Sequence, residues 1–281
     1  MIPQNFDYSA PQSLQEALSL VASGERKILA GGMSLIPMMK LRLAAPAEVV
    51  DLGRIPGLNA IAENGGFVEI GAMATHNTVE TSPVLRASCP LLPEAAGHIG
   101  DAQVRNMGTL GGSIAHADPA ADYPAALVAL EAQIRLVSVH SDRTVEASEF
   151  FLDAFTTALE PGEIVVGVRV PVEGADEGYS YQKVAHPASG FAVVGVAVRL
   201  KRGAGRITMA RIGVTGMSSH AFRDRAAEKL LEDGTPLERA AAIVGDGQEA
   251  NSDLYASADY RRHLAKIHAR RALAAALSRA S

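Results

Sequence analysis

Apolar residues change their spacing along the chain, and these changes predict a protein that mixes helices and strands. Leu14, Ala17, Leu18 and Val21 recur at helical spacing behind Ser13, which starts a capping-box pattern, so a helix is expected over residues 13–22. Further helices are expected over residues 38–43, 90–100, 122–130, 223–231, 237–244 and 259–278.

Short apolar runs bounded by glycine, proline and polar residues predict the strands. The clearest is a hairpin in which Asn64-Gly65-Gly66 joins residues 60–63 to residues 67–70, because its turn requires positive φ angles at the centre. Other strands are expected over residues 27–30, 48–52, 133–139, 164–170, 179–184, 191–200 and 207–215, and the last three of these are expected to be antiparallel.

The order of these elements divides the chain into three parts. Residues 1–56 form a compact strand, loop, helix and strand unit, and a second part over residues 57–173 begins with the hairpin. Residues 172–178 have the glycine-containing and acidic composition of a linker, so a C-terminal part is expected over residues 174–281.

Composition narrows the classes of function that the chain can serve. A chain of 281 residues, 48% hydrophobic and 20% charged, can bury a full core, and its net charge of −5 gives no basic surface for nucleic acid. Cys89 is the only cysteine, which excludes an internal disulfide, a cysteine-ligated zinc ion and an iron–sulfur cluster carried by this chain alone. Neither a signal-peptide pattern nor an apolar run of about 18 residues is present, so we expect a cytoplasmic protein with no integral membrane segment.

Two glycine-rich segments carry the strongest chemical signal. The first glycine segment is Ala30-Gly31-Gly32-Met33-Ser34-Leu35-Ile36-Pro37, and the second glycine segment runs over residues 109–119, starting at Thr109-Leu110-Gly111-Gly112-Ser113. Adjacent glycines have no Cβ to block a ligand and can adopt positive φ, so successive amides can turn inward around an anion. The hydroxyls of Ser34, Thr109 and Ser113 can add hydrogen bonds. Together the segments predict a cradle for the pyrophosphate of a dinucleotide.

Four motifs in order along the chain resemble the FAD-binding medium subunit of the molybdenum hydroxylases, a family that includes aerobic carbon monoxide dehydrogenase and relatives of xanthine dehydrogenase. The motifs are the first glycine segment with its continuation to Leu43, then residues 70–76 ending in Thr75-His76, then residues 106–113, and then residues 117–122 with Asp118 and Asp122. The resemblance covers nearly the whole chain. It implies an α+β protein with the FAD-binding fold of the vanillyl-alcohol oxidase or p-cresol methylhydroxylase type, made of two α/β subdomains, plus a C-terminal domain with a three-stranded antiparallel sheet and helices that covers the flavin.

The resemblance also implies a function and partners. In the family, a large molybdopterin subunit hydroxylates the substrate, electrons cross [2Fe-2S] clusters in a small subunit, and FAD in the medium subunit passes them to an external electron acceptor. We therefore expect an oxidoreductase subunit, in a dimer of heterotrimers, that needs no catalytic side chain or metal of its own. The FAD-binding residues implied are Ala30, Gly31, Gly32, Met33, Ser34, Leu35, Thr75, His76, Thr109, Gly111, Gly112, Ser113, Asp118, Asp122, Lys183 and Phe191.

Local explanations compete with a cofactor role at several of these positions. Asp122 stands at an expected helix start, where a carboxylate often caps the helix, and Lys183 could be an exposed lysine at a strand end. His76 follows Thr75 near an expected helix start, so it could be a surface residue or the neighbour of a helix cap. Phe191 occupies a place where some relatives carry a tyrosine, so it can stack on a flavin but cannot supply a phenol hydrogen bond.

The remaining histidines and basic residues have ordinary structural explanations. No second ligand lies at metal-binding spacing from His116, so no metal site is expected. The basic residues from Arg261 to Arg271 alternate with apolar ones at helical spacing, which indicates the solvated face of an amphipathic helix or, alternatively, a docking face for a partner.

Two other functions stay open on the sequence. A self-sufficient FAD- and NADPH-dependent reductase, like the UDP-N-acetylenolpyruvylglucosamine reductases, would need a Ser or Cys acid at a substrate site, and the sequence places none convincingly. A nucleotide-binding module without a redox role would use only the two glycine segments. In the favoured function, the substrate pocket belongs to another subunit, and the acceptor is open among oxygen, NAD, a quinone and a cytochrome.

Overall fold

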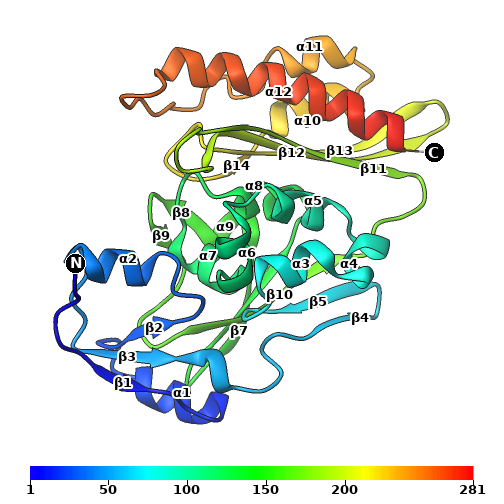
Figure 1. Ribbon diagram of the computed structural model, residues 1–281. Coiled ribbons are helices and arrows are strands. Elements are labelled where there is room, and N and C mark those ends of the chain that lie inside the picture. The colour runs from blue at the N-terminus through cyan, green and yellow to red at the C-terminus, as the bar shows by residue number, and fades with distance from the viewer. Residues whose placement is uncertain (281) are drawn as a thin grey trace.

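Three larger sheets, each from a different stretch of the sequence, organise the molecule (Figure 1), and the computed structural model describes residues 1–280. The first sheet is parallel, with the order β1-β3-β2. Its strands are β1 (Asp7–Ser9), β2 (Lys27–Leu29) and β3 (Glu48–Asp51), and its helices are α1 (Leu14–Val21) and α2 (Leu35–Lys40).

Helix α1 forms where a local cap and a buried face coincide. The Ser13 side chain accepts a hydrogen bond from Glu16 N at 3.2 Å, and the Glu16 carboxylate accepts one from Gln12 N at 2.9 Å. In a capping box, the Glu16 carboxylate would accept from the amide of the capping residue Ser13. Here it accepts from the amide of Gln12, the residue before the cap. The apolar face of α1 is buried in a small core shared with β3.

The second sheet is antiparallel, and short helices cover one of its faces (Figure 1). Its strands are β4 (Ile61–Asn64), β5 (Phe67–Gly71), β6 (Gln133–Val137), β7 (Asp142–Glu146) and β10 (Ile164–Pro171), and a separate small hairpin consists of β8 (Phe151–Asp153) and β9 (Thr156–Thr157). The helices are α3 (His76–Thr81), α4 (Pro83–Ser88), α5 (Leu91–Gly97), α6 (Ala102–Met107), α7 (Leu110–His116), α8 (Asp122–Ala129) and α9 (Ala147–Phe150). The order β4-β5-β10-β6-β7 places β10 at the centre, and the predicted β4–β5 hairpin is confirmed, with Gly65 and Gly66 at positive φ.

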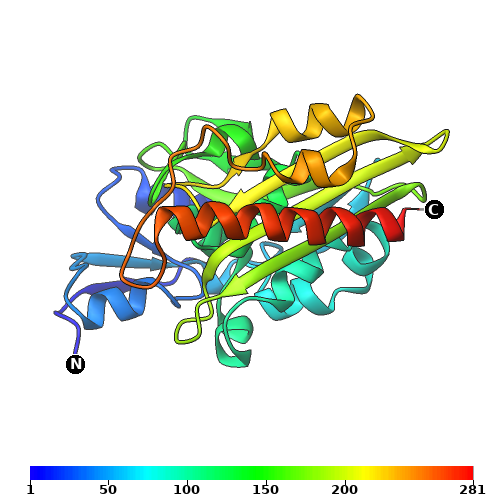
Figure 2. The same ribbon diagram turned by 90° about the horizontal axis from the view of Figure 1, so that it is seen from above.

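The third sheet lies over α5 and α8 and carries three helices on its outer face, as Figures 1 and 2 show. Its elements are β11 (Glu177–Ala185), β12 (Ala192–Gly203), β13 (Arg206–Thr215), β14 (Phe222–Arg223), α10 (Arg225–Glu232), α11 (Leu237–Ala241) and α12 (Ala258–Arg279). The three predicted antiparallel strands are present, and the two-residue β14 adds a fourth at the edge. A Cβ at Gly213 would stand 2.0 Å from Ala125 O, so glycine lets α8 approach β13 closely.

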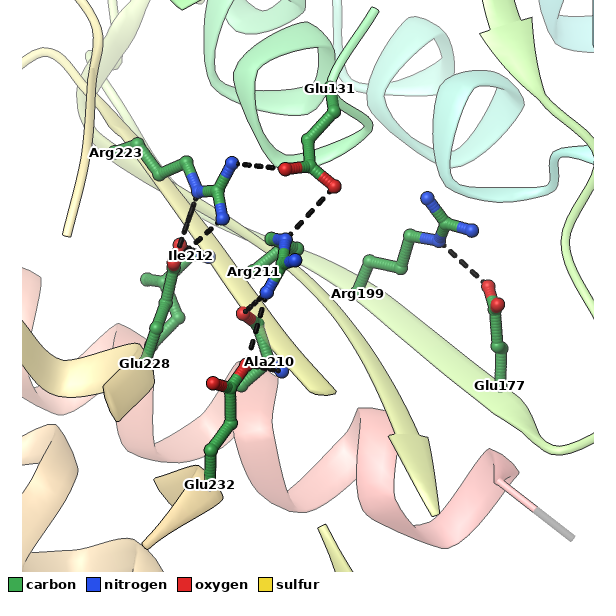
Figure 3. Close-up of polar contacts among 9 residues, drawn as sticks. All are labelled: Glu131, Glu177, Arg199, Ala210, Arg211, Ile212, Arg223, Glu228 and Glu232. Atoms are coloured by element: carbon green, nitrogen blue, oxygen red, sulfur yellow. Dashed lines mark hydrogen bonds and ion pairs between the residues drawn. The ribbon is translucent and has the colours of Figure 1, made fainter. Parts of the chain in front are cut away.

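Charged side chains tie the end of α8 to the third sheet (Figure 3). Glu131 lies 2.5 Å from Arg223 Nη1 through Oε1 and 3.0 Å from Arg211 Nε through Oε2. Arg223 also pairs with Glu228 at 2.8 Å, and Arg211 pairs with Glu232 at 3.0 Å. Burial acts to raise the pKa of Glu131, but hydrogen bonds from Arg211 and Arg223 hold it below its ordinary value. This network links the second stretch of the chain to the third.

Helix positions account for the main errors of the sequence prediction. The helix expected over residues 38–43 begins at Leu35 instead, because Pro37 lies in the first turn of α2, where a missing N–H breaks no helical hydrogen bond. Apart from the helix start expected near Thr75, which α3 confirms, no helix was predicted over residues 76–88 or 102–116, where α4, α6 and α7 also lie. Helix α6 buries none of its residues, so its sequence contains no apolar stripe to detect.

Helix α12 crosses the outer face of the third sheet (Figure 2). Leu264, His268 and Leu273 are buried on its inner side. Arg261 is only 6% exposed, so the prediction that the basic residues of this helix form a solvated face is wrong at this position. No helix within residues 1–280 combines the length and the apolar character needed to cross a membrane.

Candidate functional site

The first glycine segment forms an open turn between β2 and α2. Gly32 has a φ of +73°, a left-handed conformation that glycine adopts without strain. The amides from Gly31 to Leu35 donate to no acceptor within residues 1–280, and Met33 beside them is 38% exposed. Consecutive unpaired amides around a left-handed glycine can surround an anion such as a phosphate group.

The second glycine segment begins a helix, so the expectation that its glycines turn successive amides inward at positive φ is wrong. Thr109 caps α7, and Gly111 and Gly112 lie in its first turn without positive φ. Gly111 N donates to Ala72 O at 2.8 Å, and Gly112 N donates to Thr109 Oγ1 at 3.1 Å. These amides are used inside the protein, and only the first segment presents a run of free amides.

The two glycine segments nevertheless lie side by side. A Cβ at Gly31 would stand 2.1 Å from Met107 O, and a Cβ at Gly112 would stand 3.4 Å from the Cβ of Ala30. Gly111 faces the other way, where its Cβ would overlap the connection between β5 and α3. The glycines therefore permit the close approach of the two segments, which is how the structure brings both to one place.

Two threonines join the starts of α3 and α7 next to these segments. Thr75 and Thr109 form an isolated antiparallel bridge, and Thr75 Oγ1 accepts a hydrogen bond from Thr78 N at 3.1 Å. Both threonine hydroxyls thus serve as helix caps. By contrast, the half-buried hydroxyls of Ser34 and Ser113 have no hydrogen-bond partner in the described part of the chain, so they are available to a ligand.

His76 is buried, so its interpretation as a surface residue is wrong. Its Nδ1 lies 3.2 Å from the hydroxyl of Tyr123, and a Cβ at Gly108 would stand 2.5 Å from its Nε2. Burial, helped by the charge of Arg105, lowers the pKa of His76 from 6.5 to about 4. The imidazole is therefore neutral near pH 7, and it packs between the first turn of α3, Tyr123 and Gly108.

Asp122, Lys183 and Tyr181 form a buried polar group, here called the Asp122 group, where α8 meets β11. Asp122 Oδ2 lies 2.8 Å from Lys183 Nζ, and Oδ1 accepts a hydrogen bond from the Tyr181 hydroxyl at 2.5 Å. Lys183 also donates to His98 O at 2.9 Å, and its side chain is only 1% exposed, which contradicts the alternative of an exposed lysine. The N-cap of α8 is Ala121, so Asp122 does not cap this helix either.

Burial determines the electrostatics of the Asp122 group. It raises the pKa of Asp122, while Lys183 and Tyr181 act in the opposite direction. Burial and the neighbouring carboxylate raise the pKa of Tyr181 well above its ordinary value, so the phenol keeps its proton and donates a hydrogen bond to Asp122. The sequence analysis missed Tyr181, although Tyr181 and Lys183 are two residues apart on a strand and therefore point to the same face.

Asp118 precedes α8 and Phe191 follows β11, the two elements that carry the Asp122 group. Asp118 Oδ1 accepts a hydrogen bond from Ala120 N at 2.8 Å, which shapes the turn into α8. Phe191 lies in the connection between β11 and β12, and its side chain is 43% exposed. Within residues 1–280 no cluster of three or more His, Cys, Asp or Glu side chains could hold a metal ion, and Cys89 is buried.

Comparison with known proteins assigns this geometry to a family. Residues 4–173 match the FAD binding domain in molybdopterin dehydrogenase, and residues 179–276 match the CO dehydrogenase flavoprotein C-terminal domain. The chain belongs to the flavoproteins of the molybdopterin dehydrogenases. These flavoproteins are parts of oxidoreductases and bind FAD, so the predicted family, fold class, enzyme class and cofactor are confirmed.

Individual relatives are similar to this flavoprotein in sequence over nearly its whole length. The carbon monoxide dehydrogenase medium chain of Hydrogenophaga pseudoflava is 40% identical over 285 residues, covering 99% of both chains. The nicotine 6-hydroxylase medium subunit of Paenarthrobacter nicotinovorans is 38% identical, covering 97% of both. Among solved structures, carbon monoxide dehydrogenase from Hydrogenophaga pseudoflava matches with a TM-score of 0.97 at 41% identity over all of both chains, and quinoline 2-oxidoreductase from Pseudomonas putida 86 matches with a TM-score of 0.94 at 34% identity, covering 100% of this chain and 99% of that one.

Proposed function

We propose that this chain is the FAD-carrying electron-transfer subunit of a molybdenum hydroxylase. It would receive electrons from [2Fe-2S] clusters in a small partner subunit and pass them to an external acceptor, while a large molybdopterin subunit oxidises the substrate. The proposal is supported by full-length relatives that are medium chains or subunits of such dehydrogenases and hydroxylases. It also agrees with a chain whose only cysteine is buried, since a cluster needs several cysteine ligands.

The run of free amides in the first glycine segment is the observation that carries the cofactor site. We propose that the amides from Gly31 to Leu35 and the hydroxyls of Ser34 and Ser113 hold the FAD pyrophosphate. Ala30, Met33 and Gly112 would lie beside the same pyrophosphate, because the two glycine segments adjoin there. Bound FAD supplies the exchange between one-electron and two-electron steps, and the protein supplies position and electrostatics.

The other predicted site residues divide into supporting and contacting groups. We propose that Thr75, His76, Thr109 and Gly111 act by fixing the starts of α3 and α7, since their polar atoms or packing surfaces are engaged inside the protein. Asp118, Asp122, Lys183 and Phe191 would form the flavin side of the site: the Asp122 group supplies a fixed ion pair, and Phe191 supplies an exposed ring that can stack.

We propose that the complex is a dimer of heterotrimers in the cytoplasm, with parts over residues 1–56 and 57–173 binding FAD and a part over residues 174–281 covering the flavin. Each proposed part contains one of the three larger sheets. Native mass spectrometry of the complex purified from its own cells should give a mass of two copies of each of three subunits, and a single heterotrimer would contradict this assembly.

The cofactor assignment is tested by a matched pair of glycine variants in the full complex. The wild-type complex should absorb light at about 450 nm and release FAD on denaturation. Gly32→Ala should lose FAD, because Gly32 has positive φ and its Cβ would stand 2.6 Å from Ile36. Gly65→Ala imposes a similar backbone strain in the open β4–β5 turn and should retain FAD. A wild type without flavin, or equal flavin content in both variants, would refute the site.

A further inference from the structure

Arg261 of α12 is a buried arginine that contacts the ends of two strands. Its Nη1 donates to Val193 O at 2.6 Å and to Gly216 O at 2.7 Å, and its Nη2 pairs with Asp253. Val193 lies at the beginning of β12, and Gly216 directly follows β13. One guanidinium thus holds two neighbouring strand ends, which its planar set of donors allows.

The same strand ends hold the turn that precedes α8. Gly216 N donates to Pro119 O at 2.8 Å, and Ala192 N donates to Ala120 O at 3.0 Å. The Thr215 hydroxyl lies 2.9 Å from Pro119 O and 2.8 Å from Ala121 O, so one proton serves two carbonyls. The turn over residues 119–121 is therefore attached to β12 and β13 on the opposite side from Arg261.

The two strand ends are in close contact at the place where Arg261 donates to both. Gly216 has a φ of +79°, and a Cβ there would stand 2.6 Å from Val193 O. The carbonyl oxygens of Val193 and Gly216 both accept from Arg261 Nη1, so they lie close together, where an unsatisfied pair of acceptors would be unfavourable. Arg261 satisfies both, and its charge strengthens both hydrogen bonds.

We infer that Arg261 is a positioning residue for the FAD site. By fixing the ends of β12 and β13, it fixes the turn over residues 119–121, and this turn sets the places of Asp118 and Asp122 on either side. Arg261 belongs to the outer helix of the C-terminal part, so this part would shape the cofactor site without touching it at this point. The inference rests on the proposed function, because it takes residues 118–122 as part of the FAD site.

The test measures FAD affinity of the full chain by quenching of flavin fluorescence, with circular dichroism to confirm folding. Arg261→Met should weaken FAD binding about tenfold or more, equivalent to 1.4 kcal/mol or more. Arg262→Met is the control, since Arg262 is on the same helix, its side chain is 40% exposed, and it pairs with the exposed carboxylate of Asp259. It should bind FAD as the wild type does. Equal affinity in folded Arg261→Met and wild type would overturn the inference.

Thr215→Val provides a second route that removes only the hydroxyl between β13 and the turn. It should weaken FAD binding several-fold, and in the double variant with Arg261→Met the two losses should be less than multiplicative, because both act through the same turn. Multiplicative losses in the folded variants would overturn the inference. A folded Thr215→Val with wild-type affinity would overturn it even if Arg261→Met does not fold. A wild-type chain that takes up no FAD would instead overturn the proposed function, so the two failures are distinguishable.

Discussion

Replacing Lys183 by methionine should destabilise the chain strongly, because it leaves the carboxylate of Asp122 buried beside a single neutral donor. The lysine and aspartate side chains are only 1% and 4% exposed, and their charged atoms are 2.8 Å apart. Only the Tyr181 hydroxyl would then hydrogen-bond to the carboxylate. The cost therefore comes from the partner left behind as well as from the contact removed.

The magnitude follows from the geometry of the pair. At 2.8 Å and an effective dielectric constant of about 20, the attraction is about 6 kcal/mol, and desolvation of both ions offsets much of it. Breaking a buried pair by removing one partner typically costs about 3–5 kcal/mol, which we expect for Lys183→Met. Removing both charges, with Asp122→Asn added, should restore most of this stability, since the amide still accepts from Tyr181.

Urea unfolding of the FAD-free chain, followed by circular dichroism, measures these differences without the stabilisation that a bound ligand adds. Arg135→Met is the control, because Arg135 and Asp142 pair at 2.6 Å with side chains 60% and 52% exposed, and it should cost about 1 kcal/mol or less. If Lys183→Met also costs less than about 1 kcal/mol, or the double variant is as unstable as the single one, the reasoning about burial is wrong.

Three further predictions concern separate features. The pKa of His76 is about 4 in the folded chain, against 6.5 ordinarily, so the unfolded chain binds the proton first as the pH falls. The free energy of unfolding should therefore fall by about 2 kcal/mol from pH 7 to pH 5. Urea midpoints measured across this range should show the decrease, and His76→Phe should reduce it. Phe191→Ala should change stability by less than about 0.5 kcal/mol yet alter the flavin absorption spectrum of the complex, whereas Phe155→Ala, which removes a similarly exposed ring, should leave the spectrum unchanged. Glu131→Gln should lower the free energy of unfolding by about 1 kcal/mol or less, because the Glu131 side chain is 42% exposed. This difference, measured by urea unfolding, should shrink in 1 M salt, where the Debye length is about 3 Å. A difference that does not depend on salt would contradict an ionic interaction.

Local sequence signals were reliable where one short segment contains all the information. The hairpin at Gly65 and Gly66 needs only a turn with positive φ between two apolar runs, and α1 needs only a cap at Ser13 and an apolar stripe. Helix α6 defeats the same reasoning, because it buries no residue and so lacks the one-sided pattern that identifies a surface helix. Helix α8 was expected over residues 122–130 and is confirmed, although it buries all of its residues.

For the candidate site too, some features follow from short sequence segments and others from the tertiary structure. By itself, the sequence identified the family and its FAD-binding fold through the resemblance of four motifs, and both are confirmed. It also predicts an anion site at the first glycine segment, because that prediction depends on residue types at fixed short spacing. Only the tertiary structure decided that the amides of Gly111 and Gly112 are used inside the protein, that Asp122 pairs with Lys183, and that Arg261 is buried. Except for the bond from Gly112 to Thr109, those facts depend on contacts between segments far apart in the chain, and burial then sets how strongly the charged groups interact.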